Sequence, residues 1–241
     1  MKLDILAFGS HPDDIELTCA GTLWKAVREG KKVGIIDMTQ GELGTRGNNR
    51  IRAKEAAAAA KILGCVRENL NISDGNIELT MKNRIKVIQV IRKYRPRYLL
   101  IPHFSERHPD HVNTHHLCRE AWFYAGLKKI GTKIDGTMQE PWRPENYFNY
   151  MQWQEFQPTF IIDITDAFDR RLQAILAHKS QFYDPKSKDP QTLLSQKSFL
   201  DFVETRAKFY GYQIGVKYGE PFYSVEPIGL TTLSGLQMFK G

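Results

Sequence analysis

Short apolar runs alternate with longer segments of helical character over the first 130 residues of the chain. The apolar runs predict buried strands, and the segments between them have the spacing of helices that end at glycine. Strands are expected at residues 3–9, 32–37 and 98–101, with a weaker candidate at 69–73, and helices at 14–29, 50–63, 81–94 and 112–127. Alternating strands and helices favour a parallel sheet, so the pattern predicts an α/β fold in which a mostly parallel, Rossmann-like sheet is flanked by helices.

The pattern becomes less regular after residue 130. Glycine and proline interrupt residues 131–144, which are predicted to form a loop. Strands are expected at 147–153 and 160–164 and helices at 166–182 and 193–211, followed by an irregular tail rich in aromatic residues. No linker or internal repeat divides the chain. We therefore predict a single domain over residues 1–241, with a Rossmann-like core (1–130) and a C-terminal extension (131–241) that completes the sheet and the substrate pocket.

The composition is that of an ordinary globular protein, with 41% hydrophobic and 25% charged residues. No apolar run approaches the roughly 20 residues that span a bilayer, and the N-terminus does not have the pattern of a secretory leader. The three cysteines (Cys19, Cys65 and Cys118) are widely spaced and form no CxxC pair. These features predict reduced thiols, a cytoplasmic location and no membrane partner.

A net charge of +7 raises the question of a nucleic-acid partner. Much of the excess lies in residues 82–97 and in arginines 46, 50 and 52. Apolar residues interleave with the charges in 82–97, which indicates an amphipathic helix with a solvated face. Residues 8–12 are not a phosphate-binding glycine loop, and no single-strand-binding array of basic and aromatic residues is present. We expect no nucleic-acid partner; a small anionic substrate would fit the charge equally well.

Two short clusters of histidine and aspartate follow the predicted strands. Residues 11–14 (HPDD) come directly after the first strand, and residues 108–111 (HPDH) come soon after the strand at 98–101. A single His-Pro-Asp segment is often only a turn with an aspartate cap. Two such segments at the carboxyl edge of one parallel sheet, where ligands bind, favour a functional site.

The residue types in these clusters suit a catalytic metal. Zinc accepts imidazole nitrogen and carboxylate oxygen, and catalytic sites use three protein ligands and a water molecule. His11, Asp14 and His111 are the predicted ligands, whereas a structural zinc would more often use cysteine. Zn²⁺ is therefore the expected cofactor, with Fe²⁺ as the alternative that the same ligands accept.

The remaining residues of the clusters can transfer protons. Asp13 is predicted to be the general base, because its place near a helix N-terminus favours the ionised form. Protonated His108 could stabilise an oxyanion or donate a proton to a leaving amine, with Asp110 orienting it. His115 lies one helical turn after His111 and could extend the cluster, while His178 is interpreted as structural.

At this point the chain resembles the LmbE-like (PIG-L) N-acetylglucosaminide deacetylases, whose members carry motifs like HPDD and HPDH. Residues 41–47 (GELGTRG), 179–185 (KSQFYDP) and 218–222 (YGEPF) resemble the branch that makes bacillithiol. The resemblance implies a zinc-dependent hydrolase that removes acetate from N-acetylglucosaminyl malate to give glucosaminyl malate, and it implies the same metal ligands and base.

The resemblance also suggests how a glycoside substrate is held. Arg52 matches a position that the family uses for substrate, and Arg46 and Arg107 are weaker candidates, since an arginine fork suits the carboxylates of malate. His178 departs from the family pattern next to residues 179–182 and, if near the site, could alter substrate choice. No aromatic gate can be selected among the tyrosines at 183, 218 and 223.

Three alternatives remain open from the sequence. The enzyme could act on another N-acetylglucosaminide or on the amide of a sugar–thiol conjugate. The chain could instead be a nucleotide- or nucleic-acid-binding module, or a metal- or sugar-binding protein without turnover, although the complete set of catalytic residue types argues against the last. A homo-oligomer is expected, because enzymes of this kind are often symmetric assemblies.

Overall fold

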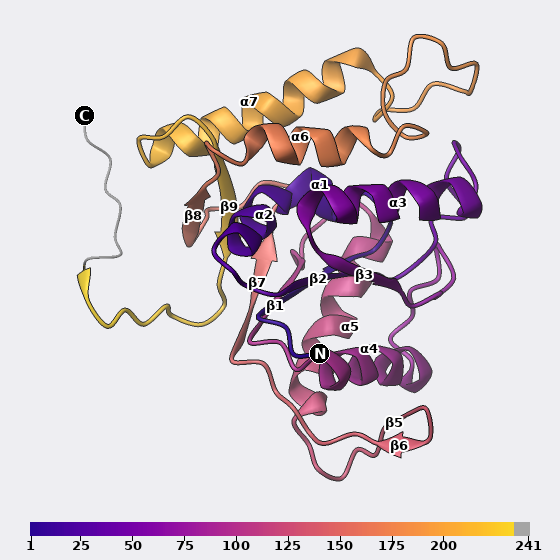
Figure 1. The fold of residues 1–241 in the computed structure, drawn as a ribbon, viewed down its shortest axis with the longest axis vertical. Coiled ribbons are helices and arrows are strands. Elements are labelled where there is room, and N and C mark those ends of the chain that lie inside the picture. The colour runs from indigo at the N-terminus through magenta and orange to yellow at the C-terminus, as the bar shows by residue number, and fades with distance from the viewer. Residues whose placement is uncertain (234–241) are drawn as a thin grey trace.

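A twisted seven-stranded sheet forms the centre of the computed structural model, which describes residues 1–233 (Figure 1). The strand order is β3-β2-β1-β4-β7-β9-β8, and the first five strands of this order run parallel. The strands are β1 (Ile5–Gly9), β2 (Val33–Asp37), β3 (Val66–Asn69), β4 (Tyr98–Pro102), β7 (Asn146–Tyr150), β8 (Phe160–Asp163) and β9 (Gly219–Tyr223). The mostly parallel α/β fold predicted from the sequence is confirmed.

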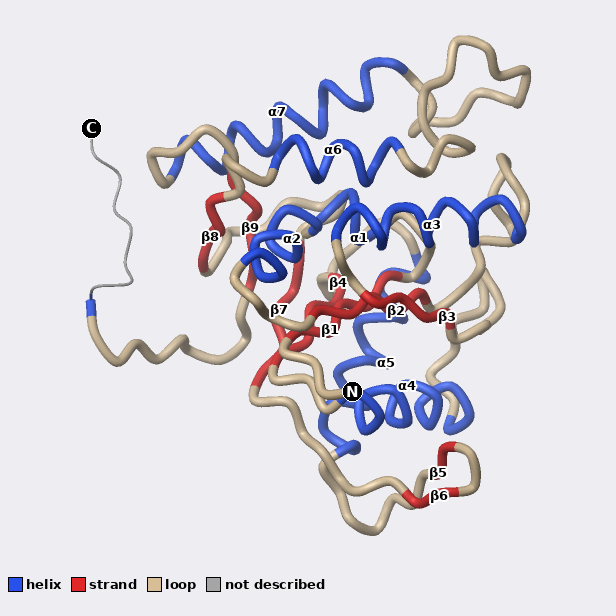
Figure 2. The backbone as a smooth tube through the Cα atoms, in the orientation of Figure 1, coloured by secondary structure: helices blue, strands red, loops and turns tan. Residues whose placement is uncertain are grey.

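Helices cover both faces of the sheet (Figure 2). The helices are α1 (Asp14–Thr18), α2 (Ala20–Arg28), α3 (Asn49–Leu63), α4 (Met81–Tyr94), α5 (Pro109–Ala125), α6 (Phe168–Leu176) and α7 (Lys197–Gln213). In Figure 1, α4 and α5 lie on one side of the sheet, whereas α1, α2, α3 and α6 lie on the other, with α7 outermost beside α6. No helix within residues 1–233 combines the length and apolar character that a bilayer span requires.

The core is divided into two layers by the sheet. Leu6 and Phe8 of β1 pack with Val87 and its neighbours under α4 and α5, whereas Ala7 packs with Leu23 of α2 on the opposite face. Successive strand residues point to opposite faces, so a strand covered on both sides must be apolar throughout. This requirement explains the uninterrupted apolar runs of the sequence.

The C-terminal part differs most from the sequence prediction. The tail predicted to be irregular contains β9, which lies between β7 and β8 and runs antiparallel to both. The strands that pair with β9 lie far away in the sequence, so no local alternation of apolar and polar residues predicts it. The predicted loop at 131–144 contains a small hairpin, β5 (Lys133–Ile134) with β6 (Thr137–Met138).

Smaller differences concern the ends of elements. The predicted helix over 14–29 is broken at Cys19, whose backbone (φ −135°, ψ 14°) leaves the helical region. The predicted helix over 166–182 ends at Leu176. The strand expected at 69–73 comes earlier, as β3.

The fold brings the two His/Asp clusters together. β1 and β4 are neighbouring parallel strands, with Ile5 opposite Tyr98. Their carboxyl ends therefore open at the same edge of the sheet, and the loops that follow them meet there.

Candidate metal centre

His11 and Asp14 occupy a tight loop between β1 and α1. The Asp14 carboxylate accepts a hydrogen bond from the His11 backbone N–H (2.9 Å), and Asp14 Oδ2 lies 3.6 Å from His11 Nδ1. Both distances follow from the shortness of the loop, which turns the two side chains toward one point. The structure therefore brings together the two residues that the sequence predicts as metal ligands in this segment.

His111 reaches the same point from the first turn of α5. Its Nε2 lies 3.5 Å from Asp14 Oδ1, and ligand atoms of His11, Asp14 and His111 all lie within 4.8 Å of one another. Burial alone would raise the pKa of the Asp14 carboxyl, but His111 and His11 outweigh burial and hold this pKa well below its usual range. Two imidazoles and an ionised carboxylate form a donor set that fits zinc.

Two carboxylates support His11 from its other edge. His11 Nε2 lies 3.0 Å from Asp74 Oδ1 and 3.4 Å from Asp110 Oδ2. Metal-binding histidines usually donate their second ring N–H to such a group, which favours a metal on the Asp14 side of the ring. His11, His108 and Asp110 form a second group of possible metal ligands within 4.8 Å of one another. In this group, however, His11 faces Asp110 with Nε2, which the carboxylates of Asp74 and Asp110 already contact.

Asp110 contacts His11 rather than His108 through its side chain. Its carboxylate also accepts the N–H of Gly75 (2.8 Å), while its own backbone N–H donates to His108 Nδ1 (3.2 Å). The predicted orientation of His108 by Asp110 thus has only this backbone contact. Asp74 was missed by sequence reasoning, because it lies in a loop without a recognisable pattern.

Asp13 lies beside the ligand cluster with an unusual backbone. Its φ of 137° and ψ of −20° fall in a backbone region that residues other than glycine rarely adopt, and the Asp13 side chain is buried. Burial raises the pKa of the Asp13 carboxyl to about 6, against the opposing effect of Arg52. At neutral pH the carboxylate is mostly ionised and basic enough to take a proton.

His108 lies at the more exposed side of the cluster. Its ring stacks on His111 at 4.8 Å between centroids and meets the edge of His11 at 4.9 Å. Partial burial, together with the charges of His11 and His111, lowers the pKa of His108, while Asp110 opposes the shift. The imidazole is therefore neutral at neutral pH in this arrangement.

A cavity of about 310 Å³ opens above these groups. Its polar lining includes the ligand cluster and Asp74. Its apolar and aromatic lining, termed the apolar wall, consists of Leu17, Leu43, Trp153, Leu194, Phe199 and Phe202. A substrate with a polar ring and a separate substituent would meet both kinds of surface.

The three predicted substrate-binding arginines are placed differently. Arg107 lines the cavity and stacks over Trp153 (4.4 Å to the ring centroid), and its guanidinium forms no ion pair with an acidic side chain among residues 1–233. Arg52 also lines the cavity, but its guanidinium is buried against Asp13. Arg46 does not line it.

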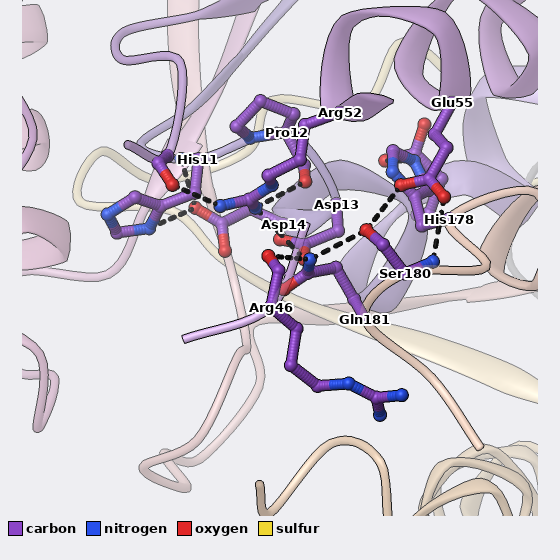
Figure 3. A network of polar contacts seen from close by, with 12 residues as sticks. His11, Pro12, Asp13, Asp14, Arg46, Arg52, Glu55, His178, Ser180 and Gln181 are labelled. Atoms are coloured by element: carbon purple, nitrogen blue, oxygen red, sulfur yellow. Dashed lines mark hydrogen bonds and ion pairs between the residues drawn. The ribbon is translucent and has the colours of Figure 1, made fainter. Parts of the chain in front are cut away.

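The guanidinium of Arg46 points away from the cluster in Figure 3. It donates to Ser187 Oγ (2.6 Å) and lies 3.5 Å from the Phe182 carbonyl oxygen. The prediction that Arg46 holds substrate therefore has no support in this geometry.

Sequence reasoning also missed Gln152 and Arg206. Gln152 Nε2 donates to Asp14 Oδ1 (2.6 Å), and Arg206 of α7 donates to the Leu17 carbonyl (3.1 Å) and to the carbonyl of Gln152. Burial, with a contribution from Arg171, lowers the pKa of Arg206 to about 10. Gln152 follows β7 at the same sheet edge, but the sequence pattern places it inside a strand predicted over 147–153.

The other histidines that sequence analysis singled out lie away from the cavity. His115 Nδ1 contacts the Pro102 carbonyl oxygen (2.9 Å), burial lowers the pKa of His115 to about 4, and neither candidate ligand group includes this residue. His178 is fully buried against Glu16 of α1, with Nε2 3.4 Å from Glu16 Oε2. None of the tyrosines at 183, 218 and 223 lines the cavity, whose aromatic residues are Trp153, Phe199 and Phe202.

Comparison with known proteins connects this geometry to a family. The model of the family PIG-L, GlcNAc-PI de-N-acetylase, matches residues 6–122. The solved structure of the conserved protein TT1542 from Thermus thermophilus is 35% identical, covers 97% of this chain and all of its own, and superposes with a TM-score of 0.86.

Two curated relatives have named activities. A diacetylchitobiose deacetylase from Thermococcus kodakarensis is 28% identical over 229 residues, which is 90% of this chain and 80% of the relative. A mycothiol S-conjugate amidase from Streptomyces coelicolor is 26% identical over 249 residues, covering 77% of this chain and 84% of the relative.

Proposed function

Because the chain belongs to the PIG-L (LmbE-like) deacetylase family, we propose that it is a zinc-dependent hydrolase of an anionic N-acetylglucosaminide, namely N-acetylglucosaminyl malate. The products are acetate and glucosaminyl malate, a step of bacillithiol synthesis. The observation that carries the anionic substrate is Arg107, a cavity arginine whose guanidinium forms no ion pair with an acidic side chain in the described chain.

His11, Asp14 and His111 would hold the metal. A zinc ion supplies Lewis-acid chemistry there, polarising the acetyl carbonyl and lowering the pKa of a water molecule. Gln152 and Asp74 complete this side of the site, since each lies within hydrogen-bond distance of a proposed ligand.

Asp13 and His108 would handle the protons. The Asp13 carboxylate takes a proton from the attacking water, whose oxygen bonds to the acetyl carbon. The carbon–nitrogen bond then breaks, and the sugar nitrogen takes the proton that Asp13 removed from the water, so that it leaves as an amine. Neutral His108 donates a hydrogen bond to the carbonyl oxygen during this step.

Arg107 would bind the malate carboxylates. Its stacking on Trp153 fixes the plane of the guanidinium, which leaves a flat fork suited to a carboxylate. A charge-assisted hydrogen bond contributes about 1.5–3 kcal/mol, which corresponds to at least tenfold in specificity.

Acetate release from purified, zinc-loaded protein tests this proposal. N-acetylglucosaminyl malate should be hydrolysed with a kcat/KM about tenfold or more above those of N-acetylglucosamine and diacetylchitobiose. Arg107→Gln should remove this preference while leaving the rate on N-acetylglucosamine unchanged. A preference for either neutral sugar would overturn the malate assignment.

The apolar wall of the cavity favours a second candidate substrate. Leu17, Phe199 and Phe202 would accept the non-polar S-substituent of a sugar–thiol conjugate. The name of the Streptomyces coelicolor relative describes an amidase for a thiol S-conjugate. Including such a conjugate in the same assay distinguishes the two candidate substrates. Faster hydrolysis of the conjugate's amide than of the acetyl group of N-acetylglucosaminyl malate would indicate an amidase.

A further inference from the structure

We propose that Arg52 is a positioning residue that holds the His11–Asp14 loop in its ligand-presenting shape, and that residue 41 is glycine to leave room for the Arg52 guanidinium. Only the kinetic test of this role for Arg52 rests on the proposed function. It replaces the expectation that Arg52 binds substrate directly.

The loop needs an external support. Asp13 lies between His11 and Asp14, two of the proposed metal ligands, and its φ of 137° is one that residues other than glycine rarely adopt. Such a backbone persists only where the surrounding structure holds it in place. A relaxation at Asp13 would move the two flanking ligands relative to each other.

Arg52 supplies this support through one planar group. Nη2 donates to the Pro12 carbonyl (2.9 Å) and lies 3.3 Å from Asp13 Oδ2, while Nη1 donates to the Gly41 carbonyl (2.8 Å). Figure 3 shows the guanidinium between Pro12 and Asp13. The remaining nitrogen, Nε, is buried without a partner in the described structure, and the Arg52 side chain is only 5% exposed, so little of the guanidinium is open to a substrate.

Arg52 itself is held by the helix it comes from. It lies in the first turn of α3, where the Asn48 side chain caps the helix by accepting the N–H of Ile51. The Arg52 guanidinium with its contacts to Pro12, Asp13 and Gly41, termed the clamp, therefore joins α3, the loop after β2 and the strained loop after β1.

The Arg52 guanidinium leaves no room for a side chain at position 41. A Cβ at position 41 would lie 1.8 Å from Arg52 Nη1 and 2.3 Å from Cζ, which is far inside contact distance. Gly41 also has a positive φ of 69°. Gly30 offers a matched control, because its φ is 79° but nothing lies within 4 Å of the Cβ that it would gain.

Zinc affinity tests the clamp without any substrate. We expect Arg52→Ala and Gly41→Ala each to raise the zinc dissociation constant about tenfold, measured by competition with a chromophoric chelator, because support behind metal ligands usually has this effect. Gly30→Ala should leave the zinc dissociation constant unchanged. Gly41→Ala retains the arginine, so it remains informative if Arg52→Ala folds poorly.

A double variant shows whether the two residues act as a unit. Once Arg52 is alanine, the space beside Gly41 is open, so adding Gly41→Ala should raise the zinc dissociation constant no further. Independent addition of the two effects would overturn the proposal.

Kinetics separate positioning from substrate contact. Arg52→Ala, assayed at saturating zinc, should lower kcat with little change in KM, because the base is misplaced while the substrate surface is kept. Unchanged zinc affinity together with a raised KM would assign Arg52 to the substrate instead. If the unaltered protein hydrolyses no N-acetylglucosaminide, the proposed function fails while the zinc measurement still decides on the clamp.

Discussion

The two His-Pro-Asp segments lie at neighbouring strand ends, yet they are held in place by different means. The second segment is organised by its own helix. His108 is the N-cap residue of α5, with an ordinary extended backbone (φ −87°, ψ 123°), and its Nδ1 accepts the N–H of Asp110. Pro109 occupies the first helical turn, where proline is favoured.

The first segment depends on residues far away in the chain. Asp13 has a strained backbone, Arg52 of α3 holds it, and Glu16 behind it is buried against Arg67 of β3 and His178 after α6. The comparison shows that similar sequences can be fixed locally in one place and only by the tertiary structure in another. Substitutions within each segment and behind it test this difference.

Asp13→Asn should have the largest effect. Loss of the general base is expected to lower kcat about a thousandfold, while zinc content and the folded state are kept, because asparagine preserves shape and Asp13 is not a proposed ligand. Metal analysis and acetate release on the same sample measure both quantities. Loss of zinc, or an unchanged rate, would contradict the assignment.

Asp13→Gly is the matched variant for the strain. It also removes the base, but glycine adopts the φ of 137° freely. It should therefore be more stable than Asp13→Asn by about 1 kcal/mol in denaturant unfolding. Equal stabilities would show that the loop is not strained and would weaken the comparison between the two segments.

His178→Gln removes the side chain that contacts Glu16 of α1 from a distant part of the chain. The His178 ring faces Glu16, and removing one partner of a buried ion pair costs about 3 kcal/mol. Thermal and denaturant unfolding at equal zinc loading measure this loss. His116→Gln on α5 is the control and should change the free energy of unfolding by less than about 0.5 kcal/mol.

The His178 contribution should depend on pH. Burial lowers the pKa of His178, but Glu16, helped by Asp13, outweighs burial and raises this pKa above the usual 6.5. Folded protein thus holds the proton more tightly than unfolded protein, so the stabilisation is complete below pH 6.5 and is lost as the pH rises through the raised pKa. A difference between wild type and variant that grows with pH would reverse the sign and refute the ion pair.

The contrast between the segments also explains what the sequence could predict. Parallel strands end at one sheet edge, so the convergence of His11, Asp14 and His111 followed from the strand pattern. Arg107 directly precedes the second segment and lines the cavity, while its predicted contact with substrate stays a prediction.

The unpredicted features depend on contacts between distant residues. Asp74 and Gln152 reach the cluster from two separate loops, and Arg206 of α7 donates to the Gln152 carbonyl. No local pattern distinguishes these three residues from surface residues. Arg46 lies only six residues from Arg52, yet the direction of each guanidinium is set by its tertiary partners. β9 was overlooked for the same reason, since its strand neighbours are supplied by distant parts of the chain.

Replacing His108 should have the smallest effect on stability and tests the local half of the comparison. His108→Ala removes the side chain that caps α5 and should cost about 1 kcal/mol, whereas His108→Asn retains a good cap and should cost little. For a chain of this size the two variants should differ in Tm by about 2–4 °C. Both lose the imidazole, so kcat should fall about a hundredfold in each. If alanine and asparagine unfold alike, the second segment is not held by its own helix cap, and both segments depend on tertiary contacts.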